Sequence, residues 1–73
     1  MTVQVLPHRR LYYRAIGENI RSAREAKGWS QLRLGMEIEV SGVAVSYWEG
    51  GKRRPNAYDL DRLEAVLGAR LRP

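Results

Sequence analysis

The stretch from residue 29 to residue 55 limits most strongly what this chain can fold into, because it contains two helix starts with few residues between them. Ser30 and Ser41 each suit the position before a helix, since a hydroxyl oxygen can accept hydrogen bonds from the unpaired N–H groups of a first turn. The pair Gly50-Gly51 permits positive φ and ends the second helix, and Pro55 prevents that helix from resuming. The stretch therefore predicts two short helices of about two turns each, joined by a tight turn.

Apolar side chains recur at helical spacing in four segments of the chain and indicate which face each helix buries. Two of these segments are the short helices just described, and the others lie within 11–27 and over 57–67, where Asn56 can cap the last helix. The apolar stripes expected in chain order are Tyr12 or Tyr13 with Ile16, Ile20 and Ala23, then Leu34 and Ile38, then Val45 and Trp48, then Leu60, Leu63 and Leu67. The prediction is an all-α fold, a compact bundle of four to five helices.

The first ten residues differ in character from the rest and predict a short basic arm (1–10) ahead of a single domain over 11–73. Residues 2–6 alternate weakly in polarity and then meet Pro7, which is typical of an extended segment. Such an arm either stays disordered or pairs as an edge strand with another copy. The first helix begins ahead of Gly17 or at Gly17 itself, since a glycine inside a helix costs about 1 kcal/mol relative to alanine.

Composition narrows the classes of function. A chain of 73 residues has room for one domain, whose core contributes roughly 3–5 kcal/mol, so self-association would help it. Having no cysteine and only one histidine excludes a disulfide framework and a thiolate zinc site and argues against an imidazole metal site. The net charge of +5 favours a polyanionic partner, either nucleic acid or an anionic membrane surface. No apolar run reaches about 18 residues, so we expect no membrane insertion and a cytoplasmic protein.

The inventory of reactive residues argues against an enzyme and against a bound cofactor. The chain offers no cysteine nucleophile, no plausible Ser–His–acid set and no glycine-rich nucleotide loop. The run Gly50 to Lys52 is only superficially similar to the end of a P-loop, because Arg53 stands where that motif requires Ser or Thr.

With these features in place, residues 16–68 resemble the Cro/phage-repressor helix-turn-helix family, also called the xenobiotic-response-element family. The resemblance needs no insertion and covers most of the chain. It rests on Ile20, Arg24, Lys27-Gly28, Ser30-Gln31, Leu34, Ile38, Val40-Ser41, Val45-Ser46, Trp48-Glu49, Gly51-Lys52-Arg53, Pro55, Leu60, Leu63 and Leu67-Gly68. It implies a lambda-repressor-like fold.

The resemblance also implies how such a domain meets DNA. The helix over 41–49 would lie in the major groove with its N-terminal residues toward the base edges. Gln31 would place its amide against a phosphate, and the loop behind the second helix would grip the sugar–phosphate backbone. The DNA-binding residues expected on this basis are Gln31, Ser41, Gly42, Val43, Ala44, Ser46, Tyr47, Lys52, Arg53 and Arg54.

Several positions depart from the family pattern. Residues 42–44 are Gly-Val-Ala and offer little beyond apolar contact to thymine methyls, so specificity from this helix should be modest. It would need help from Gln31, from DNA shape, or from Arg9 and Arg10 entering a minor groove. Glu39 replaces the usual turn glycine and predicts strain or an altered turn. Glu64, where a small apolar residue is common, predicts a face open to a partner.

The function expected from the resemblance is a sequence-specific double-stranded-DNA-binding transcriptional regulator of repressor or controller type, prokaryotic or phage, acting in the cytoplasm at the nucleoid. A homodimer is expected because one small helix discriminates weakly, whereas two half-sites about one helical turn apart can reach useful specificity. The alternative is a protein-interaction module such as an antitoxin that clasps a toxin. That alternative predicts exposed apolar surface on the arm or the last helix and a tight heteromeric partnership, whereas the regulator predicts salt-sensitive binding to an inverted repeat.

Overall fold

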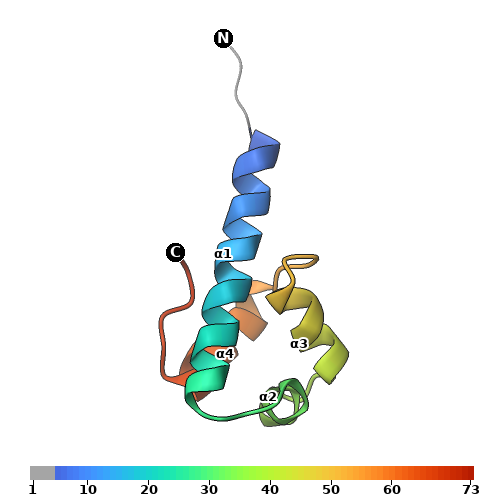
Figure 1. Cartoon of the computed structure of the whole chain (residues 1–73), viewed down its shortest axis with the longest axis vertical. Coiled ribbons are helices and arrows are strands. Elements are labelled where there is room, and N and C mark those ends of the chain that lie inside the picture. The colour runs from blue at the N-terminus through green and yellow to red at the C-terminus, as the bar shows by residue number, and fades with distance from the viewer. Residues whose placement is uncertain (1–4) are drawn as a thin grey trace.

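The computed structural model of the chain describes residues 5–73, which form four α-helices and no strand. They are α1 (Val5–Ala26), α2 (Gln31–Ile38), α3 (Gly42–Glu49) and α4 (Ala57–Leu67). Figure 1 shows the three shorter helices gathered around the C-terminal half of α1, while its N-terminal half projects beyond them. The expected all-α bundle is confirmed with four helices, and the last residues form no fifth helix.

The N-terminal end of α1 differs from the expectation. A helix already begins at Val5, so the prediction of an extended arm over residues 1–10 is wrong from that residue on, and residues 1–4 lie outside the described part. The proline at position 7 is compatible with this start, because the N–H that proline lacks would stay unpaired in a first helical turn anyway.

Gly17 does not start α1 either, since the helix runs through it without a break. The glycine is needed for close packing instead. A Cβ at this position would lie 2.2 Å from the carbonyl oxygen of Trp48 and 2.9 Å from that of Glu49. The backbone at the end of α3 therefore rests directly on α1.

Both helices of the central pair begin as the sequence predicts. The Ser30 hydroxyl accepts a hydrogen bond from the Arg33 N–H at 2.9 Å, and the Ser41 hydroxyl accepts one from the Ala44 N–H at 3.0 Å. The pair crosses tightly, because a Cβ on Gly35 would lie 2.5 Å from the carbonyl oxygen of Val40. Position 35 of α2 therefore has no room for a side chain, because the backbone of the following turn occupies that space.

The turn between α2 and α3 carries the strain that Glu39 predicts. Glu39 adopts a left-handed conformation with φ 63° and ψ 42°, and it is the one non-glycine residue with positive φ in the described part of the chain. Its N–H donates to the carbonyl of Gly35, so the position closes α2. The turn geometry is therefore the one that glycine usually supplies, held here by a residue with a Cβ.

Replacing Glu39 by glycine should stabilise the fold. A left-handed residue with a Cβ costs roughly 1–2 kcal/mol, and the greater freedom of glycine in the unfolded chain returns part of that. We expect Glu39→Gly to raise the free energy of unfolding by about 0.5–1 kcal/mol in urea titrations. Glu39→Ala, which removes the carboxylate but keeps the Cβ, is the matched control and should not stabilise. Equal gains in both variants would assign the effect to charge instead of backbone strain.

The core joins all four helices and the C-terminal segment. Among residues 9–73, whose side chains are described, ten hydrophobic residues are buried: Ile16, Ile20, Leu34, Ile38, Val45, Trp48, Leu60, Leu63, Leu67 and Leu71. All but Leu71 were expected from helical spacing. Trp29 packs half-buried against this core, and the Lys27 and Arg33 cations lie 5.1 Å and 4.7 Å from the centre of its ring.

Glu64 fastens the C-terminal segment to the bundle. Its carboxylate accepts hydrogen bonds from the N–H groups of Leu71 (2.8 Å) and Arg72 (3.3 Å), and the Asn19 amide donates to the Leu71 carbonyl at 2.8 Å. The Leu71 N–H, more than the Arg72 cation, holds the pKa of Glu64 below its usual value. The prediction that Glu64 leaves a face open to a partner is therefore wrong, because the chain's own C-terminal segment fills that place.

Candidate nucleic-acid interface

The two sides of α3 have different surroundings. Val45 and Trp48 are buried in the core, with 0% and 6% of their surfaces exposed. On the other side Val43 is 61% exposed, Tyr47 is 42% exposed, and Ser46 is also exposed. The chain therefore leaves the outer face of α3, defined by Val43, Ser46 and Tyr47, open for a ligand.

Two of the residues expected on this face are less available. Gly42 is half-buried, because α2 passes close by: a Cβ on Gly42 would lie 3.3 Å from the Cα of Leu32. Ala44 is also half-buried and packs against the core. Only the part of its surface that stays exposed could face a ligand, so the expected contact is wrong for the rest of the side chain. Ser41 is exposed, but its hydroxyl already accepts the Ala44 N–H as the helix cap.

The chemistry of the outer face is sparse. It offers the methyl groups of Val43 and the hydroxyls of Ser46 and Tyr47, with no guanidinium, ammonium or amide group. Bidentate recognition of a guanine or an adenine needs one of those groups, whereas a hydroxyl can pair with several bases and a methyl group can touch thymine. The face can thus fit a groove, but it can select bases only weakly.

The loop after α3, residues 51–54 (the basic loop), lies beside this face. The N–H groups of Lys52 and Arg53 both donate to the carbonyl of Tyr47, at 3.0 Å and 3.4 Å, which folds the loop back over the end of α3. The side chains of Lys52, Arg53 and Arg54 are exposed, and within residues 5–73 none of them forms an ion pair with a carboxylate. Three cations are therefore available to an anionic ligand at this edge.

A buried ion pair fixes the other end of the site. Glu49, the last residue of α3, has a side chain that is 0% exposed and lies against Arg24 of α1, with Nε–Oε2 at 2.6 Å and Nη2–Oε1 at 3.0 Å. The Arg24 guanidinium also donates to the Trp29 carbonyl at 2.7 Å, and Arg21 approaches Glu49 at 3.5 Å. This cluster ties α3 to α1 and to the segment that leads into α2.

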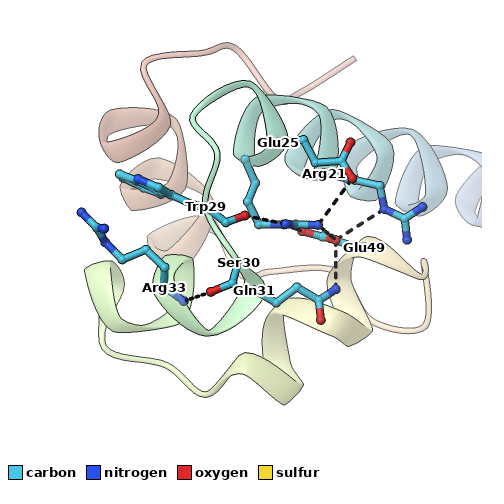
Figure 2. Close-up of polar contacts among 8 residues, drawn as sticks. Arg21, Glu25, Trp29, Ser30, Gln31, Arg33 and Glu49 are labelled. Carbon is cyan, nitrogen blue, oxygen red and sulfur yellow. Dashed lines mark hydrogen bonds and ion pairs between the residues drawn. The ribbon is translucent and has the colours of Figure 1, made fainter.

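Gln31 belongs to the same cluster. Its amide nitrogen donates to Glu49 Oε1 at 3.0 Å (Figure 2), so one of the two amide hydrogens expected to meet a phosphate is already used. Within residues 5–73 the other amide hydrogen donates no hydrogen bond and the amide oxygen accepts none. The structure thus gives Gln31 the task of joining α2 to α3, and leaves only part of its amide for a ligand.

The family resemblance includes Arg24 and Glu49, but it predicts no structural or DNA-binding role for them. A signal for them exists in the sequence: Arg24 follows Ile20 by four residues and Glu49 follows Val45 by four, so each charge falls on a stripe that is otherwise buried. Opposite charges on two buried stripes indicate an ion pair, since a lone buried charge would be very costly.

The stability of the fold should fall in acid because of this cluster. Burial alone would raise the pKa of Glu49, but the hydrogen bonds from Arg24 and Gln31 outweigh burial and hold the pKa below its usual value. A carboxyl whose pKa is lower in the folded state stabilises the fold fully above the unfolded pKa, about 4.3, and loses that contribution as pH falls through the folded pKa. The pKa of Glu64 is lowered as well and adds in the same direction.

We therefore expect Tm to be nearly constant from about pH 7 to pH 5 and to fall steadily below about pH 4. Thermal melts followed by circular dichroism would measure it. Glu64→Gln should remove part of this acid dependence. A Tm that rises on acidification would contradict the assignment.

Two further features are not found within residues 5–73. No group of three or more histidine and acidic side chains is placed to hold a metal ion. None of the helices in that range has both the length and the apolar surface that crossing a bilayer requires.

Comparison with known proteins places these features in a wider group. A sequence model described as helix-turn-helix matches residues 20–72. Multiprotein-bridging factor 1 of Schizosaccharomyces pombe is 36% identical over 59 residues, which are 81% of this chain and 40% of that protein. A protein of Yarrowia lipolytica described as multi-protein-binding factor 1 is 34% identical over 58 residues, 80% of this chain and 38% of its own length. The chain thus spans about two fifths of these relatives, and no solved structure matches it.

Proposed function

The chain belongs to the helix-turn-helix family, as a Cro/repressor-like domain, and from that membership we propose that it binds double-stranded DNA as part of a transcription regulator. The observation that carries the proposal is the open outer face of α3, which is flanked by three cations without carboxylate partners in residues 5–73. In this arrangement α3 lies in the major groove and the basic loop lies on the phosphates beside it.

The two parts of the site have separate tasks. Lys52, Arg53 and Arg54 neutralise phosphates, which provides affinity without regard to sequence. Val43, Ser46 and Tyr47 contact base edges and provide a modest sequence preference. Because that preference is modest, we propose that a homodimer reads two half-sites, as a repressor or controller of prokaryotic or phage type would.

A second candidate function has its own support. Leu32 and Met36 on α2 are 63% and 66% exposed, and with Val43 they give the helix-turn-helix pair an apolar outer surface. The two relatives carry names that describe binding to or bridging of several proteins. A protein partner, of which a toxin is one kind, could therefore dock on this surface in place of DNA, or together with it.

The experiment that tests the proposal compares two variants on a fluorescein-labelled duplex of random sequence, with anisotropy measured from 50 to 200 mM salt. Arg53→Ala should weaken binding equally on all sequences and lower the magnitude of the salt slope by about one. Val43→Gln should keep that slope but change which sites are enriched from a random duplex pool. Arg70→Ala, an exposed cation in the C-terminal segment, is the matched control for lost charge.

Three results would count against the proposal. Absence of duplex binding by the unaltered chain at 50 mM salt would favour the protein-binding candidate. If Arg53→Ala lost affinity for one DNA sequence only, the basic loop would not be a phosphate contact. If Val43→Gln selected the same sites as the unaltered chain, Val43 would not contact base edges.

A further inference from the structure

We infer that the projecting N-terminal half of α1 is a second phosphate-binding element, which continues the basic loop and contacts the DNA backbone outside the groove that α3 occupies. The inference rests on the proposed function. It concerns Arg9, Arg10 and Arg14 of α1 together with Lys52, Arg53 and Arg54, here called the cationic strip.

The first support is the way in which the basic loop lies on α1. A Cβ on Gly51 would lie 2.8 Å from the Cγ of Arg14 and 3.4 Å from its Cα, so the loop backbone rests on that residue. The Arg54 guanidinium lies 5.9 Å from the centre of the Tyr13 ring. Figure 1 shows the same relation, with the loop after α3 beside the middle of α1. Positions 13 and 14 therefore mark the face of α1 that turns toward the basic loop.

Helical spacing extends this face toward the N-terminus. Residues four apart lie on one side of a helix, so Arg9 stands one turn beyond Tyr13 and Arg10 one turn beyond Arg14. Both arginines are exposed, and each lies about 6 Å farther along the helix axis than its neighbour in the next turn. The cations of α1 and of the loop thus form one surface, and not two separate patches.

The charge of this surface is unusually one-sided. Residues 1–17 contain no Asp or Glu, and neither do residues 50–58. Several arginines elsewhere are paired, namely Arg24 with Glu49, Arg33 with Glu37, and Arg72 with Asp61 and Glu64, whereas Arg62 and Arg70 have no carboxylate partner within residues 5–73. Within residues 5–73, none of the six cations of the cationic strip is paired with a carboxylate. Six uncompensated cations along one line favour a regularly charged, elongated polyanion.

Duplex DNA is the occupant that fits best. It presents one phosphate charge per about 1.7 Å of axis, and the loop half of the strip already adjoins the face proposed to enter its groove. Leu11 and Tyr12, just before the residues that touch the loop, are 62% and 40% exposed, and this part of α1 would reach phosphates adjacent to the loop's own. An acidic protein surface is the other class of partner that the cationic strip could bind, and the experiment below distinguishes it from duplex DNA.

The test uses the full chain with Arg9→Gln and Arg10→Gln together, titrated with the same labelled random duplex. Each lost phosphate contact lowers the slope of log K against log salt by about 0.9, so the double variant should lower its magnitude by about two. Between 50 and 200 mM salt this corresponds to about a 12-fold smaller loss of affinity. The double variant Arg9→Lys and Arg10→Lys should keep the slope of the unaltered chain, since charge and helix propensity are both retained.

The matched control removes two charges elsewhere, with Arg62→Gln and Arg70→Gln in α4 and the C-terminal segment, and should change the slope by less than half as much. Circular dichroism at 222 nm checks that α1 stays helical in every variant. If the Arg9/Arg10 variant keeps its slope while Arg53→Ala lowers it, this inference fails and the proposed function stands, with an acidic protein as the strip's remaining partner. If the Arg9→Gln/Arg10→Gln variant and the Arg62→Gln/Arg70→Gln control lowered the salt slope equally, the inference would be overturned, because the effect would then come from net charge alone. If the unaltered chain binds no duplex, the proposed function itself fails.

Discussion

Glu49→Ala is expected to leave most of the chain unfolded at 25 °C. The Glu49 side chain is 0% exposed and that of its partner Arg24 is 11% exposed, so the substitution leaves a mostly buried guanidinium with only the Trp29 carbonyl and, at 3.9 Å, the exposed Glu25 carboxylate as partners. Removing one partner of a buried ion pair costs about 3–5 kcal/mol. A core of this size contributes roughly the same amount in total, so little stability would remain. Gln31 and Arg21 would lose their shared acceptor at the same time.

Urea titration followed by circular dichroism at 222 nm measures this directly. Glu37→Ala is the matched control, because Glu37 pairs with Arg33 on the surface at 2.8 Å and such a pair contributes less than about 0.5 kcal/mol. A Glu49→Ala chain as stable as the control would show that the ion pair contributes nothing and that the cluster in Figure 2 does not hold α3 in place.

Gly17→Ala is expected to be the second most damaging change, although alanine favours a helix by about 1 kcal/mol over glycine. The new Cβ would lie 2.2 Å from a backbone oxygen at the end of α3, and a carbonyl in a helix cannot rotate away as a flexible side chain can. Either α3 moves off α1 or one of the helices bends. Overpacking of this kind costs about 1–3 kcal/mol or more, so we expect a net loss of about 2 kcal/mol.

The matched control for that change is Ser22→Ala, which raises helix propensity at an exposed position of the same helix. It should raise the Tm slightly, whereas Gly17→Ala should lower it by several degrees. A Gly17→Ala chain that melts at or above the Tm of the unaltered chain would show that α1 and α3 have room to separate without cost.

Both changes also bear on the proposed DNA contact, because they act where α3 ends. The Gly17 contact sets how closely the end of α3 lies on α1, and the Glu49 cluster joins that end to α1 and α2. The basic loop begins immediately afterwards, and its direction depends on the same end. Variants that fold but shift this junction should therefore bind duplex more weakly even though no DNA-facing side chain has changed.

The sequence by itself determined the parts of the fold that depend on near neighbours. The caps at Ser30, Ser41 and Asn56 lie where they were predicted, and each hydroxyl or amide oxygen accepts from the N–H three residues later. The buried stripes of the helices follow from spacings of three and four residues, which one segment reveals alone. For the same reason the two-sided character of α3 could be predicted, and so could the strain at Glu39.

The tertiary structure alone decided what depends on residues distant in the chain. The ion pair of Arg24 with Glu49 spans 25 residues, and the contact of Asn19 with Leu71 spans 52. The contact of Gln31 with Glu49 spans 18 residues, and Gly17 is required because the backbone of Trp48 and Glu49 lies against it. Local patterns cannot show such pairs, because whether a charge is buried and what it meets depend on how the helices cross. The cationic strip likewise became visible only once the loop after α3 was placed against Tyr13 and Arg14 of α1.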